Sequence, residues 1–348
     1  MQEEQAEALI VGGGAAGLAA AIELTDAGIE PVVLERRPGC SYRPRATMLT
    51  AAAMRLMWRW GVADEISRQG FAAEPAVSVR ASLTAPELQR IPLGEYVWAC
   101  PQDLLEEILA VRATVGGARI EYGAQLTGLC AGGDAVSAVA TTADGVQAGL
   151  RASYVIGADG ARSTVRRLAG ITTTGERQRH DWLNITFRAP VRDYVSDPPF
   201  MVYRIASASG EEGFVVPADG ADRWSSYLPW HPELGQQLAD FDADRCAELV
   251  RSAAGVADLP VTVAAVDSLQ RASVVADQAR AGRVLLAGEA AHVYEPVSGP
   301  GLSLALEEGS AVAGVVAGAL RGREHASGDE PGDLQPVLRL SRRELLTR

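Results

Sequence analysis

The chain has 348 residues, 47% of them hydrophobic, which is enough to bury the core of one large domain or two modest ones. Its net charge of −12 argues against nucleic acid and anionic membrane surfaces as partners, because both select basic protein faces. All 32 basic residues are arginine, so a Schiff-base lysine, pyridoxal phosphate attachment and a P-loop lysine are excluded.

The first elements of the chain predict a βαβ unit. Residues 8–11 (ALIV) form a short buried strand, and residues 17–28 (GLAAAIELTDAG) form an apolar helix that ends at a glycine. The next strand is expected at 31–35 (PVVLE). A strand, a helix and a second strand in this order imply a parallel sheet.

The middle of the chain continues this alternation of helices and strands. Helices are expected at 50–61 and 101–116, with an alternating strand at 76–82 between them. A further strand at 151–160 runs into a turn, and a short helix follows at 162–170.

The pattern changes between about residues 176 and 275, where alternating strands predict an antiparallel block inside a βαβ protein. These strands are expected at 182–189, 200–207, 213–217 and 223–230. Residues 282–292 then return to a buried strand, residues 301–322 form a long apolar helix, and residues 323–348 form a polar linker with one basic helix.

A glycine-rich turn carries the first chemical motif. Gly12, Gly14 and Gly17, with Ala16 before the last of them, complete a GxGxxG pattern between a strand and a helix. The glycines permit a tight turn, a close approach of a pyrophosphate and close helix packing, and the helix amino terminus attracts the anion. Glu35 ends the second strand, where an acid accepts hydrogen bonds from the hydroxyls of an adenosine ribose.

Two arginines follow this acid and bear on the choice of dinucleotide. Arg36, a candidate contact to the dinucleotide, and Arg37 would suit the 2′-phosphate of NADP, but Glu35 would repel that phosphate. No second GxGxxG follows a later strand, so a dedicated nicotinamide domain is not expected.

Two later stretches extend the pattern. Residues 156–166 (IGADGARSTVR) place an Asp-Gly pair at a strand end, and taken alone this is an ordinary turn. Residues 288–303 (GEAAHVYEPVSGPGLS) place a glutamate after a buried strand and a Gly-Pro-Gly step before the long helix.

Together, in this order and spacing, the three stretches resemble the class A flavoprotein monooxygenases, the para-hydroxybenzoate hydroxylase-like family. The resemblance covers about residues 8–322 and implies an α/β fold. This fold has a Rossmann-like FAD-binding domain on a parallel sheet, with an inserted antiparallel-sheet substrate domain. The implied division is 1–75, 98–175 and 276–322 for the FAD-binding domain, 76–97 and 176–275 for the substrate-binding domain, and 323–348 for the linker and last helix.

The resemblance also implies roles for single residues around FAD. Arg45 would contact the phosphates, Gln102 the ribityl chain, and Asp159 would be the aspartate of the Asp-Gly motif. Glu289 would accept a hydrogen bond from a ribityl hydroxyl, and Pro296 would lie near the reactive edge of the flavin. The backbone of Gly301, Leu302 and Ser303 would direct N–H groups at the flavin pyrimidine ring, and Gly299 is a further expected cofactor-binding residue.

The chain departs from the family pattern beside the flavin. Glu289 stands where the family has aspartate, Ser303 where asparagine is usual, and Glu295 where proline is common. These differences motivate an alternative function, a FAD-binding cyclase or isomerase without redox turnover. His292 also matches the family, and we interpret it as a packing residue. For Glu289, the competing interpretation is a solvent-exposed side chain beside a packing turn.

Aromatic residues concentrate between 181 and 230, which favours a pocket for a planar substrate on the face of the sheet towards the flavin. The simpler alternative is that these rings fill the core behind the sheet. The pocket candidates are Phe200, Tyr203, Phe214 and Trp224, and the candidate substrate-polarising groups are Tyr227 and His231.

We therefore expect a FAD-dependent monooxygenase that uses NADPH or NADH and O₂ to hydroxylate or epoxidise an aromatic or polyketide-like small molecule in secondary metabolism. A reductase of isoprenoid double bonds is a third alternative. The four cysteines are scattered, so no metal site is expected. The acidic amino terminus and the lack of an apolar run of roughly 20 residues predict a cytoplasmic protein without a membrane span.

Overall fold

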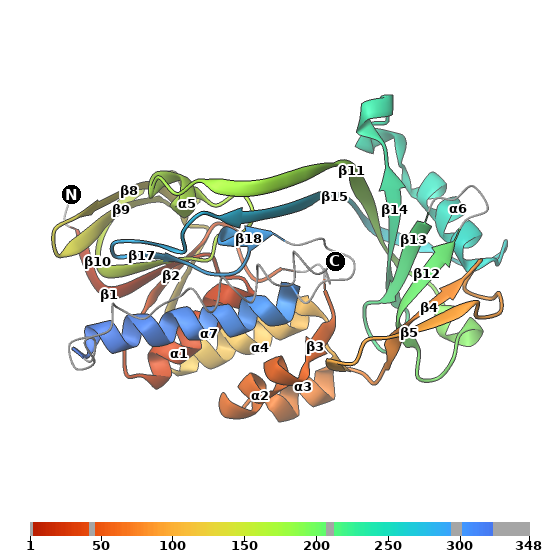
Figure 1. The fold of residues 1–348 in the computed structure, drawn as a ribbon, viewed down its shortest axis with the longest axis horizontal. Helices are drawn as coiled ribbons and strands as arrows, with labels where there is room; N and C mark the ends of the chain where they lie inside the picture. Colours follow the sequence, from red (N-terminus) through yellow and green to blue (C-terminus); the bar gives the residue numbers. More distant parts are fainter. Residues whose placement is uncertain (1–2, 42–45, 207–211, 294–300, 323–348) are drawn as a thin grey trace.

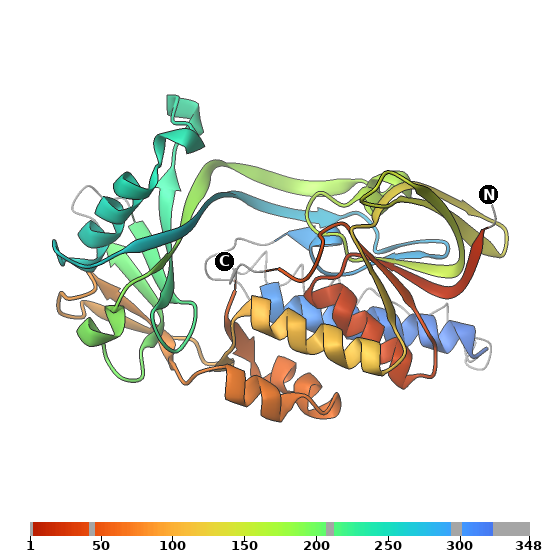
Figure 2. The same ribbon diagram turned by 180° about the vertical axis from the view of Figure 1, so that it is seen from behind.

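The computed structural model describes residues 3–41, 46–206, 212–293 and 301–322, apart from the side chains of 176–181 and 270–272. Two large sheets dominate these residues, and two long strands, β11 and β15, run from one sheet region to the other (Figures 1 and 2). The expected linker and helix at 323–348 lie outside the described residues.

The first sheet contains the βαβ unit. Its strand order is β16-β17-β10-β1-β2-β7, and β8 and β9 join it by antiparallel pairing. Neighbours from β17 to β7 pair in parallel, so the predicted parallel sheet is confirmed. The strands are β1 (Glu4–Val11), β2 (Val32–Glu35), β7 (Arg119–Tyr122), β8 (Gln125–Gly132), β9 (Ala135–Thr141), β10 (Gln147–Gly157), β16 (Arg280–Ala281) and β17 (Val284–Leu286).

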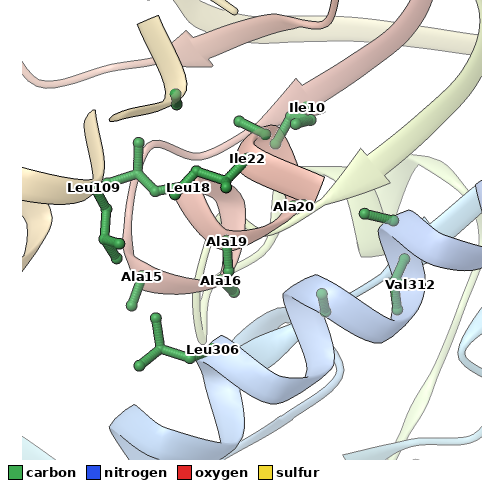
Figure 3. Packing of buried hydrophobic residues seen from close by; sticks show 14 of the residues in the cluster. Ile10, Ala15, Ala16, Leu18, Ala19, Ala20, Ile22, Leu109, Leu306 and Val312 are labelled. Carbon is green, nitrogen blue, oxygen red and sulfur yellow. The ribbon is translucent and has the colours of Figure 1, made fainter. Parts of the chain in front are cut away.

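Three helices pack together beside this sheet, and Figure 1 shows them running side by side. They are α1 (Ala15–Asp26), α4 (Gln102–Val115) and α7 (Gly301–Leu320). Their contact is apolar: Leu18 of α1 lies near Leu109 of α4, and Leu306 of α7 lies beside the start of α1 (Figure 3). α7 is long and apolar enough to span a membrane by length and composition, and this apolar character serves its packing on α1 here.

Smaller elements surround the three helices. The remaining helices are α2 (Ala51–Arg59), α3 (Ala63–Gln69), α5 (Thr164–Leu168) and α6 (Ala243–Ala254), and short 3-10 turns are η1 (Val191–Tyr194), η2 (Pro232–Leu234), η3 (Leu238–Asp240) and η4 (Gly288–Ala290). The strand expected at 282–292 is shorter than predicted, because the chain turns into η4 two residues after β17. A two-stranded ribbon pairs β3 (Met48–Thr50) with β6 (Tyr96–Ala99).

The second sheet has the strand order β18-β15-β11-β14-β13-β12-β4-β5. It is antiparallel except for the parallel pair β12–β4, so the predicted antiparallel block is present and includes strands from the 76–97 region. The sequence reading missed β15. The strands are β4 (Glu74–Arg80), β5 (Gln89–Pro92), β11 (Thr173–Arg188), β12 (Phe200–Ala206), β13 (Glu212–Pro217), β14 (Arg223–Trp230), β15 (Thr262–Ala276) and β18 (His292–Val293).

The two faces of this second sheet differ in what covers them. On the face that we call the outer face, α6 packs against Leu183, Ile185 and Phe187 of β11 and forms a core cluster. The opposite face, called the inner face, carries a separate cluster that contains Trp182 and Tyr227. Alternating side chains of one strand therefore enter two different environments.

Candidate functional site

The glycine-rich turn joins β1 to α1 by close backbone contacts. A Cβ atom at Gly12, where φ is +110°, would lie 2.2 Å from the Ala158 carbonyl oxygen. A Cβ atom at Gly17 would lie 1.8 Å from the Gly12 carbonyl oxygen, so neither position admits a larger residue. The N-cap residue Gly14 supplies no side-chain hydrogen bond, and the first turn of α1 has no acidic residue. The positive end of α1 is thus available to an anion.

Ala16 has a packing role within this turn. A Cβ atom at Gly309 of α7 would lie 2.1 Å from the Ala16 carbonyl oxygen, and one at Gly288 would lie 2.9 Å from the Ala16 Cβ. The small residues therefore bring α7 and η4 against the start of α1.

Glu35 lies at the end of β2, as predicted, and is buried. Its carboxylate accepts hydrogen bonds from the Gly13 N–H at 2.7 Å, the Arg37 N–H at 2.8 Å and the Arg37 Nε at 2.9 Å. Burial alone would raise the pKa of Glu35, but these hydrogen bonds and the Arg37 charge outweigh it and lower the pKa. Arg36 is exposed, so Arg37 is the arginine that orders this carboxylate.

A second carboxylate, which the sequence reading missed, faces the same turn. Glu106 of α4 is 1% exposed, and its Oε1 would lie 3.6 Å from a Cβ atom at Gly14. Gln102, the first residue of α4, donates from Nε2 to Glu106 Oε1 at 2.8 Å, and Arg37 Nη2 is 3.7 Å from Oε2. Burial raises the pKa of Glu106 above its usual value, which the Gln102 and Arg37 contacts only partly offset.

Asp159 of the Asp-Gly motif binds the first turn of α5, whose N-cap residue is Ser163. Its carboxylate accepts hydrogen bonds from the N–H groups of Thr164 and Val165, at 2.6 and 3.1 Å, and from the Ser163 hydroxyl. Arg166 of the same helix, α5, donates to the Ala290 carbonyl oxygen at 2.8 Å. The motif is therefore a structural turn: Asp159 holds the start of α5, and Arg166 of α5 holds η4.

The third motif lies beside the second. Glu289 is exposed, and its Oε2 would lie 3.9 Å from a Cβ atom at Gly160. Its neighbour Gly288 donates its N–H to Glu308 Oε2 at 3.0 Å, and the buried ring of His292 bonds the other oxygen of Glu308. Gly288 thus holds η4 to α7 and His292 holds β18 to it, in agreement with the packing role expected for His292.

The long helix α7 begins at Gly301, as the sequence predicted, and Leu302 and Ser303 are buried at its start. The Ser303 hydroxyl accepts a hydrogen bond from the Thr50 N–H at 3.1 Å and so ties α7 to the start of α2. Three predicted site residues, Arg45, Pro296 and Gly299, lie outside the described residues.

The aromatic candidates divide between the two faces of the second sheet. Phe200, Tyr203 and Trp224 belong to the core cluster beneath α6, and the Tyr203 hydroxyl accepts the Phe200 N–H at 3.0 Å. This placement corrects the expectation that these three rings line a pocket, because strand alternation turns them to the outer face. Phe214 lies on the inner face, where it meets Trp182 edge to face at 5.4 Å between ring centroids.

The two substrate-polarising candidates are also separated. Tyr227 lies on the inner face, opposite Asn184 on β11 and Phe214 on β13. His231 follows the end of β14, and its Nδ1 is 2.9 Å from Glu233 Oε1. The structure brings Tyr227 to the aromatic cluster and leaves His231 beyond the strand.

An ion pair between Arg223 and Asp103 shows which part of the molecule the inner face is directed towards. By strand alternation Arg223 shares this face with Tyr227. Its Nη1 is 2.6 Å from Oδ2 of Asp103, the residue that follows Gln102 in α4. The inner face therefore looks towards the helices that carry the glycine turn and the Gln102 side chain.

One family model matches almost the whole chain. The model described as "FAD binding domain" matches residues 5–328, and the chain belongs to this family. Within it, the fold is that of the class A FAD-dependent monooxygenases, the para-hydroxybenzoate hydroxylase-like fold. The cofactor that suits this fold is FAD, and the uncapped helix end, the close glycine turn and the buried Glu35 fit its diphosphate and ribose.

The relatives are bacterial hydroxylases. The chain is 31% identical over 334 residues to a putative polyketide hydroxylase of Streptomyces coelicolor, with 90% of this chain and 52% of that protein covered. It is also 31% identical to aklavinone 12-hydroxylase DnrF of Streptomyces peucetius subsp. caesius, with 91% of this chain and 68% of that protein covered. The chain thus spans about half to two thirds of the length of these relatives.

Solved structures share the fold. A ternary complex of aklavinone-11 hydroxylase with FAD and aklavinone superposes with a TM-score of 0.86 at 28% identity, covering 94% of this chain and 64% of that one. The p-nitrophenol 4-monooxygenase PnpA from Pseudomonas putida DLL-E4 has a TM-score of 0.82 at 22% identity, with 98% and 84% covered, and shows the fold alone.

Proposed function

We propose that this chain is an FAD-dependent monooxygenase that hydroxylates an aromatic, polyketide-type small molecule, with NADPH or NADH and O₂ as co-substrates. The observation that carries the proposal is the pairing of a dinucleotide cradle with an aromatic sheet face that looks towards it. The relatives that cover most of the chain are hydroxylases of polyketides or aromatic compounds, which supports the same substrate class.

In this proposal, the part of the chain with the first sheet binds the cofactor, and the part with the second sheet binds the substrate. Residues 1–75, 98–175 and 276–322 hold the cofactor, and residues 76–97 and 176–275 hold the substrate. This division is supported by the placement of β4 and β5 in the second sheet and of α7 beside α1.

Several residues would hold FAD. Glu35 would accept the adenosine ribose hydroxyls, and the free N–H groups in the first turn of α1 would bind the diphosphate. Gln102 and Glu289 would reach the ribityl chain, and the start of α7 at Gly301 would direct N–H groups to the pyrimidine end of the flavin. Asp159, which already binds the first turn of α5, would support this region through the turn that it fixes.

Bound FAD would supply the transfer of electrons from the nicotinamide to O₂ and of one oxygen atom to the substrate. The protein residues position and enclose these reactants. Trp182, Phe214 and Tyr227 offer apolar ring surface for a planar molecule and exclude water from it. The amino end of α7 would stabilise negative charge that develops on the flavin ring during reduction.

The test is turnover of the FAD-loaded chain with hydroxylated anthraquinones such as aklavinone. We expect the substrate to accelerate NADPH or NADH oxidation and the product to carry one atom from labelled O₂. Product formation without O₂ and with unreduced FAD would instead establish the alternative, a cyclase or isomerase that uses FAD as a scaffold. Nucleotide analysis after denaturation checks that FAD is the cofactor bound.

A further inference from the structure

Two polar side chains of the inner face lie buried with atoms that lack a hydrogen-bond partner. Asn184 of β11 is 5% exposed, and its Oδ1 has no partner among the described residues. Ser225 of β14 is 2% exposed, and its Oγ is likewise without a partner there. Buried polar groups are nearly always hydrogen-bonded, so each of these two atoms requires an explanation.

The register places the two side chains close together. Asn184 is opposite Tyr227, and Thr186 is opposite Ser225, in the antiparallel pair β11–β14. Asn184 and Ser225 are therefore diagonal neighbours on one face, at a spacing of about 7–8 Å. Their apolar surroundings on this face are the rings of Trp182, Phe214 and Tyr227.

The same face is directed towards the cofactor cradle. Arg223, two residues before Ser225 on the same side of β14, reaches Asp103 beside Gln102. A planar molecule lying between the inner face and the cradle would thus contact aromatic rings on one side. Asn184 Oδ1 and Ser225 Oγ, which have no partner among the described residues, would lie on the same side.

We propose that Asn184 and Ser225 are specificity residues that hydrogen-bond an oxygen substituent, a phenolic hydroxyl or a ring carbonyl, of the planar substrate. A carboxamide carries both donors and acceptors, and rotation by half a turn exchanges the two ends, so Asn184 serves either substituent. The Ser225 hydroxyl both donates and accepts as well. The inference rests on the proposed function, because that function supplies the planar substrate.

The experiment compares two probes on the FAD-loaded full chain. One is 1,8-dihydroxyanthraquinone, and the other is anthracene, which has the same three-ring outline without oxygen. Dissociation constants are measured from the change in flavin absorbance and from quenching of tryptophan fluorescence. The variants are Asn184→Leu and Ser225→Ala. The matched control is Ser226→Ala: the Ser226 hydroxyl also has no partner within the described part of the chain, but it faces the outer side of the sheet.

We expect Asn184→Leu to weaken dihydroxyanthraquinone binding about tenfold and Ser225→Ala about threefold, as loss of one hydrogen bond implies. Anthracene binding should change less than about twofold, and Ser226→Ala should bind both probes as the parent does. Asn184→Leu should also keep or raise the unfolding temperature, because an apolar group of similar size replaces a buried amide whose Oδ1 has no partner among the described residues. A purely structural asparagine would not combine a retained unfolding temperature with a selective loss of binding.

Two outcomes would overturn the inference. One is unchanged dihydroxyanthraquinone affinity in Asn184→Leu, and the other is an equal loss of both probes together with a lowered unfolding temperature. The proposed function can fail separately: a chain that binds the dihydroxyanthraquinone through Asn184 yet transfers no labelled oxygen would lose the monooxygenase assignment and keep this one.

Discussion

At the residue scale, two buried carboxylates beside the glycine turn behave differently although they share one arginine. Glu35 receives four N–H donors, one from Gly13 and three from Arg37, and its pKa is lowered despite burial. Glu106 receives donors from the Gln102 amide and the Ser41 backbone, and Arg37 Nη2 lies 3.7 Å away, but burial outweighs these contacts and its pKa is raised. Neighbouring carboxyls at one turn thus have pKa values shifted in opposite directions, because their hydrogen-bond donors differ.

The lowered pKa of Glu35 predicts how the free energy of unfolding depends on pH. Its folded pKa is lowered, so its contribution is present above the unfolded value of 4.5 and is lost as pH falls through the folded pKa. Glu35→Gln should lower the free energy of unfolding at pH 7 by about 1–3 kcal/mol. In urea titrations, the difference from the parent should shrink below pH 4.5. A difference that stays constant down to pH 3 would contradict this assignment.

The same substitution is expected to weaken FAD binding at neutral pH, because the ionised acid is the stronger acceptor for the ribose hydroxyls. The expected loss is about tenfold or more, as for a hydrogen bond to a charged group. A flavin-fluorescence titration measures it. Glu30→Gln is a suitable control, since Glu30 is an exposed residue of the same βαβ unit.

At the scale of elements, the packing of α7 on α1 places the third motif near the first. Ala16 and Gly309 meet so closely that any side chain at position 309 must separate the helices. The same contact brings η4 towards the glycine turn through Gly288. The small residues at this helix crossing therefore determine how closely α7 and η4 approach the glycine turn.

Substitutions of two glycines of α7, one at the contact with α1 and one away from it, test this contact. Gly309→Ala puts a Cβ atom 2.1 Å from a backbone oxygen and should destabilise the fold by about 1–3 kcal/mol, as overpacking does. Gly314→Ala meets no atom within 4 Å and should stabilise by about 0.5–1 kcal/mol through helix propensity. Urea unfolding of both variants gives the comparison. Equal effects of the two changes would mean that the close helix contact is absent in solution.

At the scale of the whole molecule, the sequence predicts those features of the fold that depend on residues close together in the chain. The turn at Gly12–Gly17, the helix start at Gly301 and five strands of the second sheet (β4, β11, β12, β13 and β14) follow from local spacing, and the structure has them, whereas β5, β15 and β18 were not predicted. The faces of Phe200, Tyr203 and Trp224 depend on where α6 packs, and alternation alone does not give that side. Glu106 carried no motif, because its role arises only when α4 packs beside α1.

The ion pair between Asp103 and Arg223 is the clearest product of tertiary folding, since 120 residues separate its members. It joins α4, next to Gln102, to the inner face of the second sheet. Both side chains are largely buried, so removal of Arg223 leaves the Asp103 carboxylate desolvated without this partner, whereas removal of Asp103 leaves Arg223 beside Asp219, whose Oδ2 is 3.5 Å from Nε. We expect this pair to fix the orientation of the substrate sheet relative to the cofactor helices.

A double-mutant cycle measures that coupling. Arg223→Gln should destabilise the protein by about 3 kcal/mol, the low end for a broken buried pair, because it leaves the Asp103 carboxylate buried without this partner. Asp103→Asn should destabilise it less, because Arg223 keeps some exposure and its pair with Asp219. The double variant should lose clearly less than the sum of the two, since neither charge is then left unpaired. Arg188→Gln on the neighbouring strand is the control: its pair with Asp222 is about half exposed and should contribute less than about 1 kcal/mol.

If the Asp103–Arg223 pair orients the sheet, Arg223→Gln should also weaken binding of dihydroxyanthraquinone, whereas Arg188→Gln should not. Additive losses in the cycle together with unchanged binding would show that the two sheets hold their orientation by apolar packing alone.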